Sequence, residues 1–171
     1  MNSSAFPAVL FNVPRHMEYG EMRFHPLRLH DVDLMRKVLR EDDIIAPEGL
    51  TVLISKSRLS FWWWLKKTYV ISYRIDVGPE RKGFIGLYDL AHKSAEISLV
   101  IFDDGDRRLG YGTVAFNLLA QIVRRHIREI RARVKVDNRA AVAFWSKLGF
   151  REISASGGMK LMSVALTDGR N

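Results

Sequence analysis

A short turn with two glycines, set between a strand-like and a helix-like segment, constrains the fold of this chain most strongly. The turn reads Arg107-Arg108-Leu109-Gly110-Tyr111-Gly112-Thr113. Apolar residues at 97–102 precede it, and a helical pattern at 113–127 follows it. Glycine lets the main chain approach an anion closely, and the first N–H groups of a helix have no intrahelical partner. Residues 96–150 are therefore expected to hold an anionic cofactor, with the turn as a cradle for its phosphates.

The glycine spacing disfavours two common nucleotide-binding modes. Gly110 and Gly112 lack the third glycine, and the acidic residue about 20 positions further on, that a dinucleotide fingerprint needs. The Gly-Lys-Ser/Thr sequence of a P-loop is also missing. A pyrophosphate at the helix N-terminus remains the expected ligand, and Arg107 and Arg108 would add positive charge to this site.

The composition indicates one globular domain without thiol chemistry. The chain has 171 residues, 47% of them hydrophobic, and no cysteine, so disulfides and thiolate ligands are excluded. Its five histidines show no H-x-x-x-H spacing, and no metal site is expected. Neither a run of ~18 apolar residues nor a secretory leader is visible. We therefore expect a cytoplasmic protein without a membrane partner.

The formal net charge of +8 suits nucleic acid, an acidic partner or a polyanionic cofactor. Nucleic acid is not expected, because the sequence shows neither a recognition-helix pattern nor an aromatic and basic platform. Many basic residues instead gather near the turn, which favours a polyanion bound to the domain. They are Arg107, Arg108, Arg124, Arg125, Arg128, Arg131, Arg133, Lys135 and Arg139.

Hydrophobic periodicity predicts an α+β domain with α/β character. Strands are expected at 22–29, 69–77, 84–90, 95–102, 130–136, 150–153 and 159–166. About four helices are expected, at 31–41, 57–67, 113–127 and 139–148. A meander of three strands beside a β–α–β crossover implies a mixed, mostly antiparallel sheet of six to seven strands. Residues 1–20 are interpreted as an N-terminal arm and residues 21–167 as a single domain.

Two spaced motifs resemble those of the GCN5-related N-acetyltransferases, the GNAT family. Residues 107–112 fit its R/Q-x-x-G-x-G/A acetyl-CoA motif. Residues 138–150 fit its N-x-x-A-x-x-x-Y-x-x-x-G-F motif except at Trp145, where the family often has tyrosine. One helix and one strand separate the motifs, as in the family. Residues 84–102 are most similar to the branch of ribosomal-protein alanine acetyltransferases and their small-molecule relatives.

The resemblance implies a single GNAT-fold domain that binds acetyl-CoA where two parallel strands splay, one ending near Phe102 and the other near Val136. It also implies direct transfer of the acetyl group to a primary amine of a small molecule or a protein N-terminus. The main chain of residues 100–102 would pair with the pantetheine, and the N–H groups of residues 108–113 would hold the pyrophosphate. The cofactor-binding residues implied are Val100, Ile101, Phe102, Arg107, Arg108, Leu109, Gly110, Tyr111, Gly112, Thr113, Asn138, Ala141, Phe144, Trp145 and Lys147.

The resemblance is weaker for the catalytic groups. Attack by an amine needs a proton acceptor, a donor to the carbonyl oxygen and a proton for the departing thiolate. Some relatives carry a glutamate base where this chain has Arg133, and the indole of Trp145 is no proton donor at neutral pH. Glu96 is then the candidate base, directly or through water, with an exposed or ion-paired side chain as an equal alternative. The expected catalytic residues are Glu96, Tyr111 and Asn138, with Tyr88 as a second acid and Asp89 and His92 as weaker bases.

The acceptor is predicted only as an amine. Trp62, Tyr88 and Glu96 are expected to line its site, and core packing is the alternative role for Trp62. The competing function is a non-catalytic module that binds CoA, an acyl-CoA or a protein partner on the same fold. A homodimer is compatible with the family.

Overall fold

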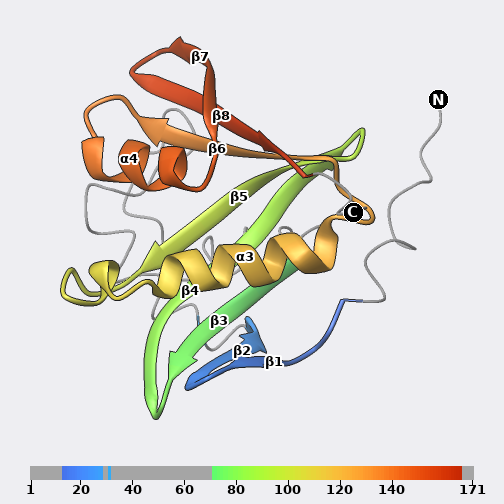
Figure 1. Ribbon diagram of the computed structural model, residues 1–171, viewed down its shortest axis with the longest axis vertical. Helices are drawn as coiled ribbons and strands as arrows, with labels where there is room; N and C mark the ends of the chain where they lie inside the picture. The colour runs from blue at the N-terminus through green and yellow to red at the C-terminus, as the bar shows by residue number, and fades with distance from the viewer. Residues whose placement is uncertain (1–12, 29–30, 32–70, 167–171) are drawn as a thin grey trace.

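The computed structural model describes residues 13–28, 31 and 71–166. Their strands form one eight-stranded sheet in the order β1-β2-β3-β4-β5-β6-β8-β7 (Figure 1). Only β5 and β6 pair in parallel, so the predicted mixed, mostly antiparallel sheet is confirmed. The strands are β1 (Met17–Tyr19), β2 (Met22–Pro26), β3 (Ile71–Val77), β4 (Glu80–Ala91), β5 (Ser94–Ile101), β6 (Glu129–Lys135), β7 (Arg151–Ser156) and β8 (Met159–Ala165).

The eighth strand corrects the predicted number of six to seven. β1 lies within residues 1–20, the expected N-terminal arm, and Met17 of this strand pairs with Phe24 of β2. Gly20 has a φ of 58°, the left-handed conformation that glycine adopts easily in the turn of a hairpin. Three residues are too few to show a period of two, so β1 left no pattern in the sequence.

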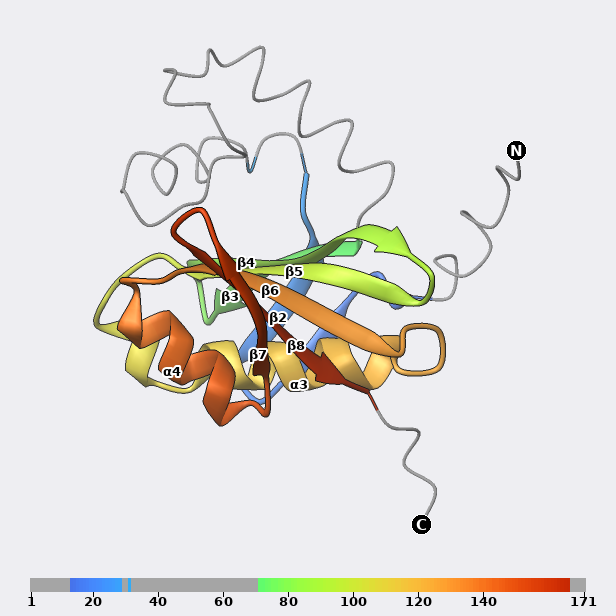
Figure 2. The same cartoon turned by 90° about the horizontal axis from the view of Figure 1, so that it is seen from above.

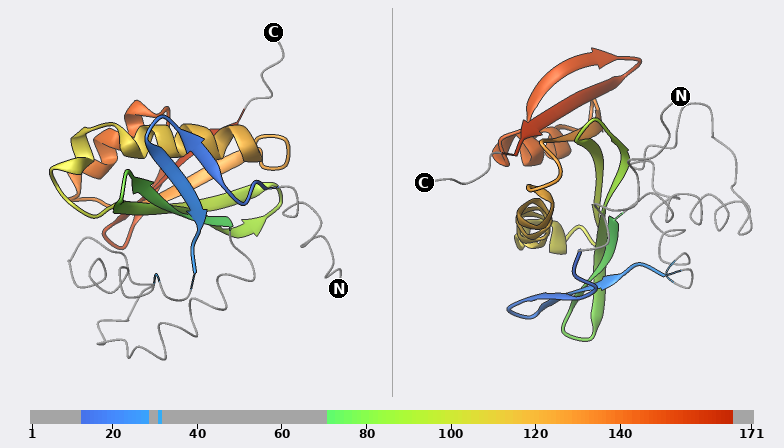
Figure 3. Two further views of the ribbon diagram at one scale, coloured as in Figure 1. Left: turned by 90° about the horizontal axis from the view of Figure 1, so that it is seen from below. Right: turned by 90° about the vertical axis from the view of Figure 1, so that its right-hand side faces the viewer.

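Two α-helices cover the same face of the sheet, α3 (Tyr111–Val123) and α4 (Arg139–Lys147) (Figures 2 and 3). Ile75, Ile85 and Leu87 of the strands are fully buried in the same core as Leu119 of α3. This burial follows from the alternation in the strands, which turns every second side chain toward the helices. No helix in the described ranges is long and apolar enough to span a bilayer.

The helix prediction is tested only in part. The predicted helix at 113–127 begins earlier, at Tyr111, and ends at Val123, because residues 124–126 form a turn. The predicted helix at 139–148 corresponds to α4. The other two expected helices, at 31–41 and 57–67, lie outside the described residues apart from Asp31. A short 3-10 helix, η2 (Asp106–Arg108), precedes α3.

The parallel strands β5 and β6 pair over three residues and then separate (Figure 1). Their register runs from Ser94 opposite Glu129 to Glu96 opposite Arg131. Beyond that pair β6 continues to pair with β8 and β5 with β4. The facing edges of residues 97–101 and 132–135 therefore border a V-shaped opening in the middle of the sheet.

Candidate functional site

The main chain of β5 presents every second N–H group to the V-shaped opening. Phe102 donates its N–H to the carbonyl oxygen of Lys82, on the β4 side, at 2.9 Å. Residues on an antiparallel strand alternate in the neighbour to which they point their N–H and C=O groups. The register is regular here, so Val100 also points toward β4, whereas Leu99 and Ile101 point toward β6.

This alternation divides the three main-chain residues predicted for the cofactor. Of Val100, Ile101 and Phe102, only Ile101 turns its N–H group into the opening, whereas the N–H groups of Val100 and Phe102 point toward β4. Leu99, which is not among the expected cofactor-binding residues, turns its N–H into the opening as well. The sequence motif marks the end of this strand but carries no signal for which edge each amide faces.

The glycine-containing turn forms a cradle at the N-terminus of α3. Gly110 is the N-cap residue of α3, with a φ of 84°, and its carbonyl accepts the first helical hydrogen bond, from Val114 at 3.1 Å. The N–H groups of residues 111–113 precede that bond and have no intrahelical acceptor. Together with the helix dipole, these N–H groups suit an anion at the position where the sequence predicts the pyrophosphate.

The two glycines of the cradle have different surroundings. A Cβ atom on Gly110 would meet nothing within 4 Å, so the space beside its Cα is open. A Cβ atom on Gly112 would lie 3.2 Å from Cζ of Phe144 and 3.4 Å from Cδ2 of Leu99. Gly110 thus supplies the backbone conformation and the open space, whereas Gly112 lets α3 pack closely on α4 and β5.

The two arginines of the cradle also differ. Arg107 donates from Nε to the carbonyl oxygen of Ile101 at 3.2 Å, and its Nη1 lies 2.5 Å from Oδ1 of Asp104. Its guanidinium therefore ties the cradle to the end of β5. Arg108 is exposed and has no ion pair with any other described residue, so its charge is available to a ligand. Leu109, between Arg108 and the helix, is 61% exposed.

The second motif caps α4 and contributes to an aromatic cluster. Asn138 accepts a hydrogen bond at Oδ1 from the N–H of Ala141 at 3.0 Å, which makes it the N-cap of α4 and leaves its Nδ2 amide as a donor. Trp145 is buried, with its ring centroid 4.9 Å from that of Phe144 and 4.8 Å from that of Phe150. Trp145 therefore packs in the core. Lys147 is exposed in the last turn.

Glu96 and Arg133 form a bidentate ion pair across the base of the opening. Arg133 Nε lies 2.9 Å from Oε2 and 3.1 Å from Oε1 of Glu96, and Nη2 lies 2.9 Å from Oε1. The side chain of Glu96 is 6% exposed and that of Arg133 is 55% exposed. The hydrogen bond to Glu96 raises the pKa of Arg133. The ion-pair alternative for Glu96 is therefore what the structure shows.

Tyr88 completes a polar cluster with this ion pair. It lies opposite Glu96 in the β4–β5 register, so both side chains share the sheet face away from α3 and α4. Burial, followed by the charge of Glu96 and a hydrogen bond with it, raises the pKa of Tyr88 well above its usual value. The phenol therefore keeps its proton throughout the neutral range. We call Tyr88, Glu96 and Arg133 the β5–β6 cluster.

The other predicted residues are placed less centrally. Tyr111 is half-buried at the first position of α3, next to the cradle. Asp89 and His92 are exposed near the β4–β5 turn, with φ values of 49° and 50°. Trp62 lies outside the described residues. No group of three or more potential metal ligands occurs among the residues that the structure describes.

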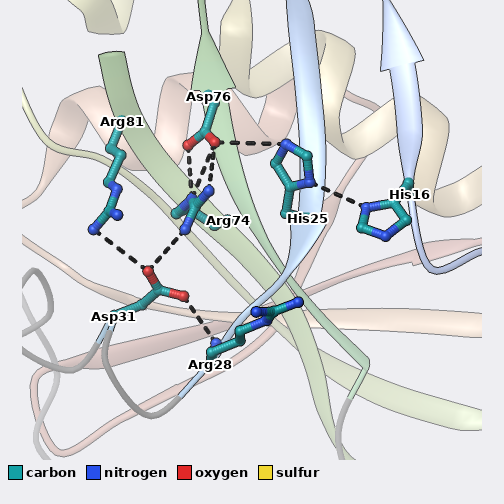
Figure 4. A network of polar contacts seen from close by, with 7 residues as sticks. All are labelled: His16, His25, Arg28, Asp31, Arg74, Asp76 and Arg81. Atoms are coloured by element: carbon teal, nitrogen blue, oxygen red, sulfur yellow. Dashed lines mark hydrogen bonds and ion pairs between the residues drawn. The ribbon is translucent and has the colours of Figure 1, made fainter. Parts of the chain in front are cut away.

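A second polar network lies at β2 and β3, on the sheet face away from α3 and α4 (Figure 4). Asp31, which is fully buried, accepts a hydrogen bond from Nη1 of Arg74 at 3.0 Å, and Arg74 also donates to Asp76 from Nη2 at 2.7 Å. His25 lies 3.7 Å from Asp76 through Nε2 and shares a 3.0 Å contact between Nδ1 atoms with His16. This network fixes the chain where it leaves β2. Its link from Asp31 to Arg74 joins residues 43 positions apart, so no local motif reveals it.

Comparison with known proteins supports the fold and the motifs. The model of the Acetyltransferase (GNAT) family matches residues 37–150. No curated protein matches the chain at a significant level. Among solved structures, a domain from Methanocaldococcus jannaschii is 15% identical with a TM-score of 0.71, over 85% of this chain and 98% of that one.

Two solved acetyltransferases have the same fold. The spermidine N-acetyltransferase from Vibrio cholerae, in complex with CoA and spermine, is 16% identical with a TM-score of 0.68, over 86% of this chain and 97% of that one. The microcin C7 self-immunity acetyltransferase MccE, in complex with acetyl-CoA and AMP, is 16% identical with a TM-score of 0.68, over 90% of this chain and 97% of that one. At these identities the likeness shows the fold alone.

The family match spans both motifs that carry the resemblance, the cradle at 107–112 and the capped helix at 138–150. It confirms the predicted family and, with it, the class of cofactor, acetyl-CoA and CoA. The similarity to the ribosomal-protein alanine branch stays a prediction. The open space at Gly110 and the splayed strands fit this cofactor. The chain belongs to the acetyltransferase (GNAT) family.

Proposed function

We propose that the protein is an N-acetyltransferase that moves an acetyl group directly from acetyl-CoA to a primary amine. The observation that carries the proposal is the combination of two anchors in one opening. The free N–H groups of α3 beside Gly110 suit a pyrophosphate, and the edge of β5 at Leu99 and Ile101 suits the amide-containing arm of the same molecule.

The residues that would hold the cofactor follow from this geometry. The N–H groups of Tyr111, Gly112 and Thr113 would bind the pyrophosphate, with added charge from Arg108. The N–H groups of Leu99 and Ile101 would bind the pantetheine or polarise the acetyl carbonyl. When bound, acetyl-CoA supplies an acetyl group activated as a thioester. Asn138 offers its Nδ2 amide as a further donor at the start of α4.

Proton transfer rests on groups around the opening. Both carboxylate oxygens of Glu96 accept hydrogen bonds from Arg133, so direct proton removal from an amine is disfavoured and we infer transfer through a water molecule. The hydroxyl of Tyr111, at the start of α3, is our candidate for the proton that a departing thiolate requires. Tyr88 is the alternative acid, since it is protonated at neutral pH.

The proposal is tested by calorimetric titration with acetyl-CoA, followed by measurement of CoA release with a panel of primary amines. We expect saturable binding of acetyl-CoA and release of CoA that depends on the amine. Absence of heat at high acetyl-CoA concentration would contradict the cofactor site. A matched titration with CoA distinguishes recognition of the nucleotide and pantetheine from recognition of the acetyl group.

A non-catalytic module that binds CoA, an acyl-CoA or a protein partner is the second candidate. The full engagement of Glu96 by Arg133 and the buried position of Trp145 favour it, because neither residue then offers a free proton-transfer group. This candidate predicts binding of acetyl-CoA without CoA release for every amine tested. Amine-dependent turnover would reject it.

A further inference from the structure

Only part of the Arg133 guanidinium is hydrogen-bonded within the described residues. Its Nε and Nη2 atoms bind the carboxylate of Glu96, whereas Nη1 has no hydrogen-bond partner among the described residues. The side chain is 55% exposed even though its partner Glu96 is buried. An arginine held in this way by a buried carboxylate has a fixed orientation and presents its remaining N–H donors to the solvent.

The position of Arg133 places these donors beside the reaction centre that we propose. Arg133 lies two residues beyond Arg131, the last residue of β6 that pairs with β5. It therefore lies where the two strands begin to separate. Ala132 and Val134 are buried in the core with the helices, so the alternation of β6 turns Arg133 to the opposite sheet face, the face of Tyr88 and Glu96.

The neighbours of Arg133 strengthen its preference for an anion. Arg131 is on the same face of β6, and its buried Nε atom has no hydrogen-bond partner, with Glu129 4.0 Å away. Asp89 contributes a negative potential at Arg133, but its exposed carboxylate is outside ion-pair distance. Glu96 is the one buried carboxylate on this stretch of β5, and Arg133 already neutralises it.

We propose that Arg133 is a specificity-determining residue that binds an oxyanion, a carboxylate or a phosphate, carried by the amine acceptor. The inference rests on the proposed function and adds the substrate class, an amine that also bears an anionic group. A fully cationic polyamine is then a poor acceptor, because its charges would meet the guanidinium of Arg133, and the described part of the site offers no unpaired buried carboxylate to receive them. Glu96 acts as the positioning residue that holds Arg133.

Matched pairs of acceptors test the charge requirement with the full chain and acetyl-CoA. One arm compares amino acids with their carboxamides, and the other compares O-phosphoethanolamine with ethanolamine. The members of each pair share a primary amine, and kcat/KM is calculated on the deprotonated amine because the anion raises the pKa of the neighbouring ammonium group. We expect kcat/KM to be about ten- to a hundredfold higher for the anionic member of at least one pair, and the arm that responds identifies a carboxylate or a phosphate. Spermidine serves as the cationic reference.

The variant Arg133→Met removes the donor and should abolish the difference in KM between the members of a pair, with an unchanged affinity for acetyl-CoA. A change in kcat caused by freeing Glu96 would affect both members alike. Arg133→Lys keeps the positive charge but lacks the planar, bidentate donor geometry of the guanidinium, and it should retain part of the preference. Arg125→Met is the matched control, because Arg125 is exposed in the turn after α3 and its loss changes the net charge equally. Thermal melting of each variant establishes that it is folded.

Three outcomes overturn the inference while leaving the proposed function intact. The first is turnover without preference for the anionic member of either pair, and the second is turnover of spermidine alone. The third is a preference that persists in Arg133→Met. Failure of the unmodified protein to bind acetyl-CoA, or to release CoA with any amine, instead contradicts the proposed function itself.

Discussion

Glu96 and Arg133, 37 positions apart in the sequence, form three hydrogen bonds of 2.9 to 3.1 Å across the base of the opening between β5 and β6. The pair links the two strands at the point where their main-chain pairing ends. One member is buried and the other is half-exposed, so the two substitutions are not equivalent.

A double-mutant cycle measures this asymmetry. Arg133→Met should lower the free energy of unfolding more than Glu96→Gln, because it leaves a buried carboxylate without its partner. We expect a coupling energy of about 1 kcal/mol from urea denaturation, a modest value because Arg133 is half-exposed. The double variant should recover part of the loss of Arg133→Met. If the losses in the free energy of unfolding of the two single variants simply add in the double variant, the pair does not couple the two strands energetically.

Gly110 is expected to be essential for cofactor binding. Gly110→Asn places a side chain in the open space beside the helix N-terminus, and asparagine tolerates the left-handed conformation better than most residues. We expect the affinity for acetyl-CoA, measured by calorimetry, to fall by at least about tenfold, as expected for the loss of one charge-assisted hydrogen bond. Gly105→Asn is the control, since Gly105 is exposed in the same loop with a φ of −61°. Equal affinities for the two variants would disprove the cradle.

Gly112 should affect stability through packing. Gly112→Ala places Cβ 3.2 Å from the ring of Phe144, and we expect a loss of about 1 kcal/mol in the free energy of unfolding although alanine is the better helix former. Phe144→Leu in the Gly112→Ala background should relieve the contact and reduce the loss. Chemical denaturation of the two single variants and the double variant provides the measurement. A more stable Gly112→Ala protein would show that Phe144 moves at no cost.

Trp145 should behave as a core residue. Trp145→Tyr restores the residue that relatives often carry, yet its hydroxyl would enter the cluster of Phe116, Phe144 and Phe150. We expect a loss of roughly 1–3 kcal/mol in the free energy of unfolding and no gain in kcat. Trp145→Phe is the control with a similar loss of volume and no hydroxyl. A higher kcat for the tyrosine variant than for the phenylalanine variant would assign a catalytic role to this position.

Stability should decline in strongly alkaline solution because of buried phenols. Burial raises the pKa of Tyr73 from 10.0 to about 12, so the folded state disfavours the phenolate that forms in the unfolded state. The free energy of unfolding should therefore be constant below pH 10 with respect to this group and fall by about 2 kcal/mol as the pH rises toward 12. Tyr88, whose pKa is also raised, acts in the same direction.

Tyr73→Phe separates this effect from that of other alkaline groups. The variant loses the hydrogen bond from the Tyr73 hydroxyl to the carbonyl oxygen of Pro14 and should be less stable by about 1 kcal/mol at pH 8. The gap between the two proteins in urea denaturation should narrow between pH 10 and pH 11. A gap that stays constant over this range would contradict the linkage.

Local patterns determined most of the architecture in advance. In strands such as β3, polar and apolar residues alternate, as expected for a sheet with one buried face. Gly110 lies at the start of α3 because glycine adopts a left-handed conformation easily, and Asn138 lies at the start of α4 because its side chain caps the helix. These signals lie within a few residues of one another, so they are visible without the fold. The short strand β1 is the exception, because three residues carry no period.

The sequence by itself therefore determined the order of the described strands and helices except β1, the glycine-containing turn before α3 and the helix that follows Asn138. Only the tertiary structure decided which N–H groups of β5 face the opening. The register between β5 and β4 sets which alternate residues of β5 point their N–H groups toward β4 and which point them toward the opening. The tertiary structure also decided that Glu96 binds Arg133 and that Trp145 is buried. These relationships join residues on different strands and helices, and their distances are set by how the sheet and helices pack rather than by spacing along the chain.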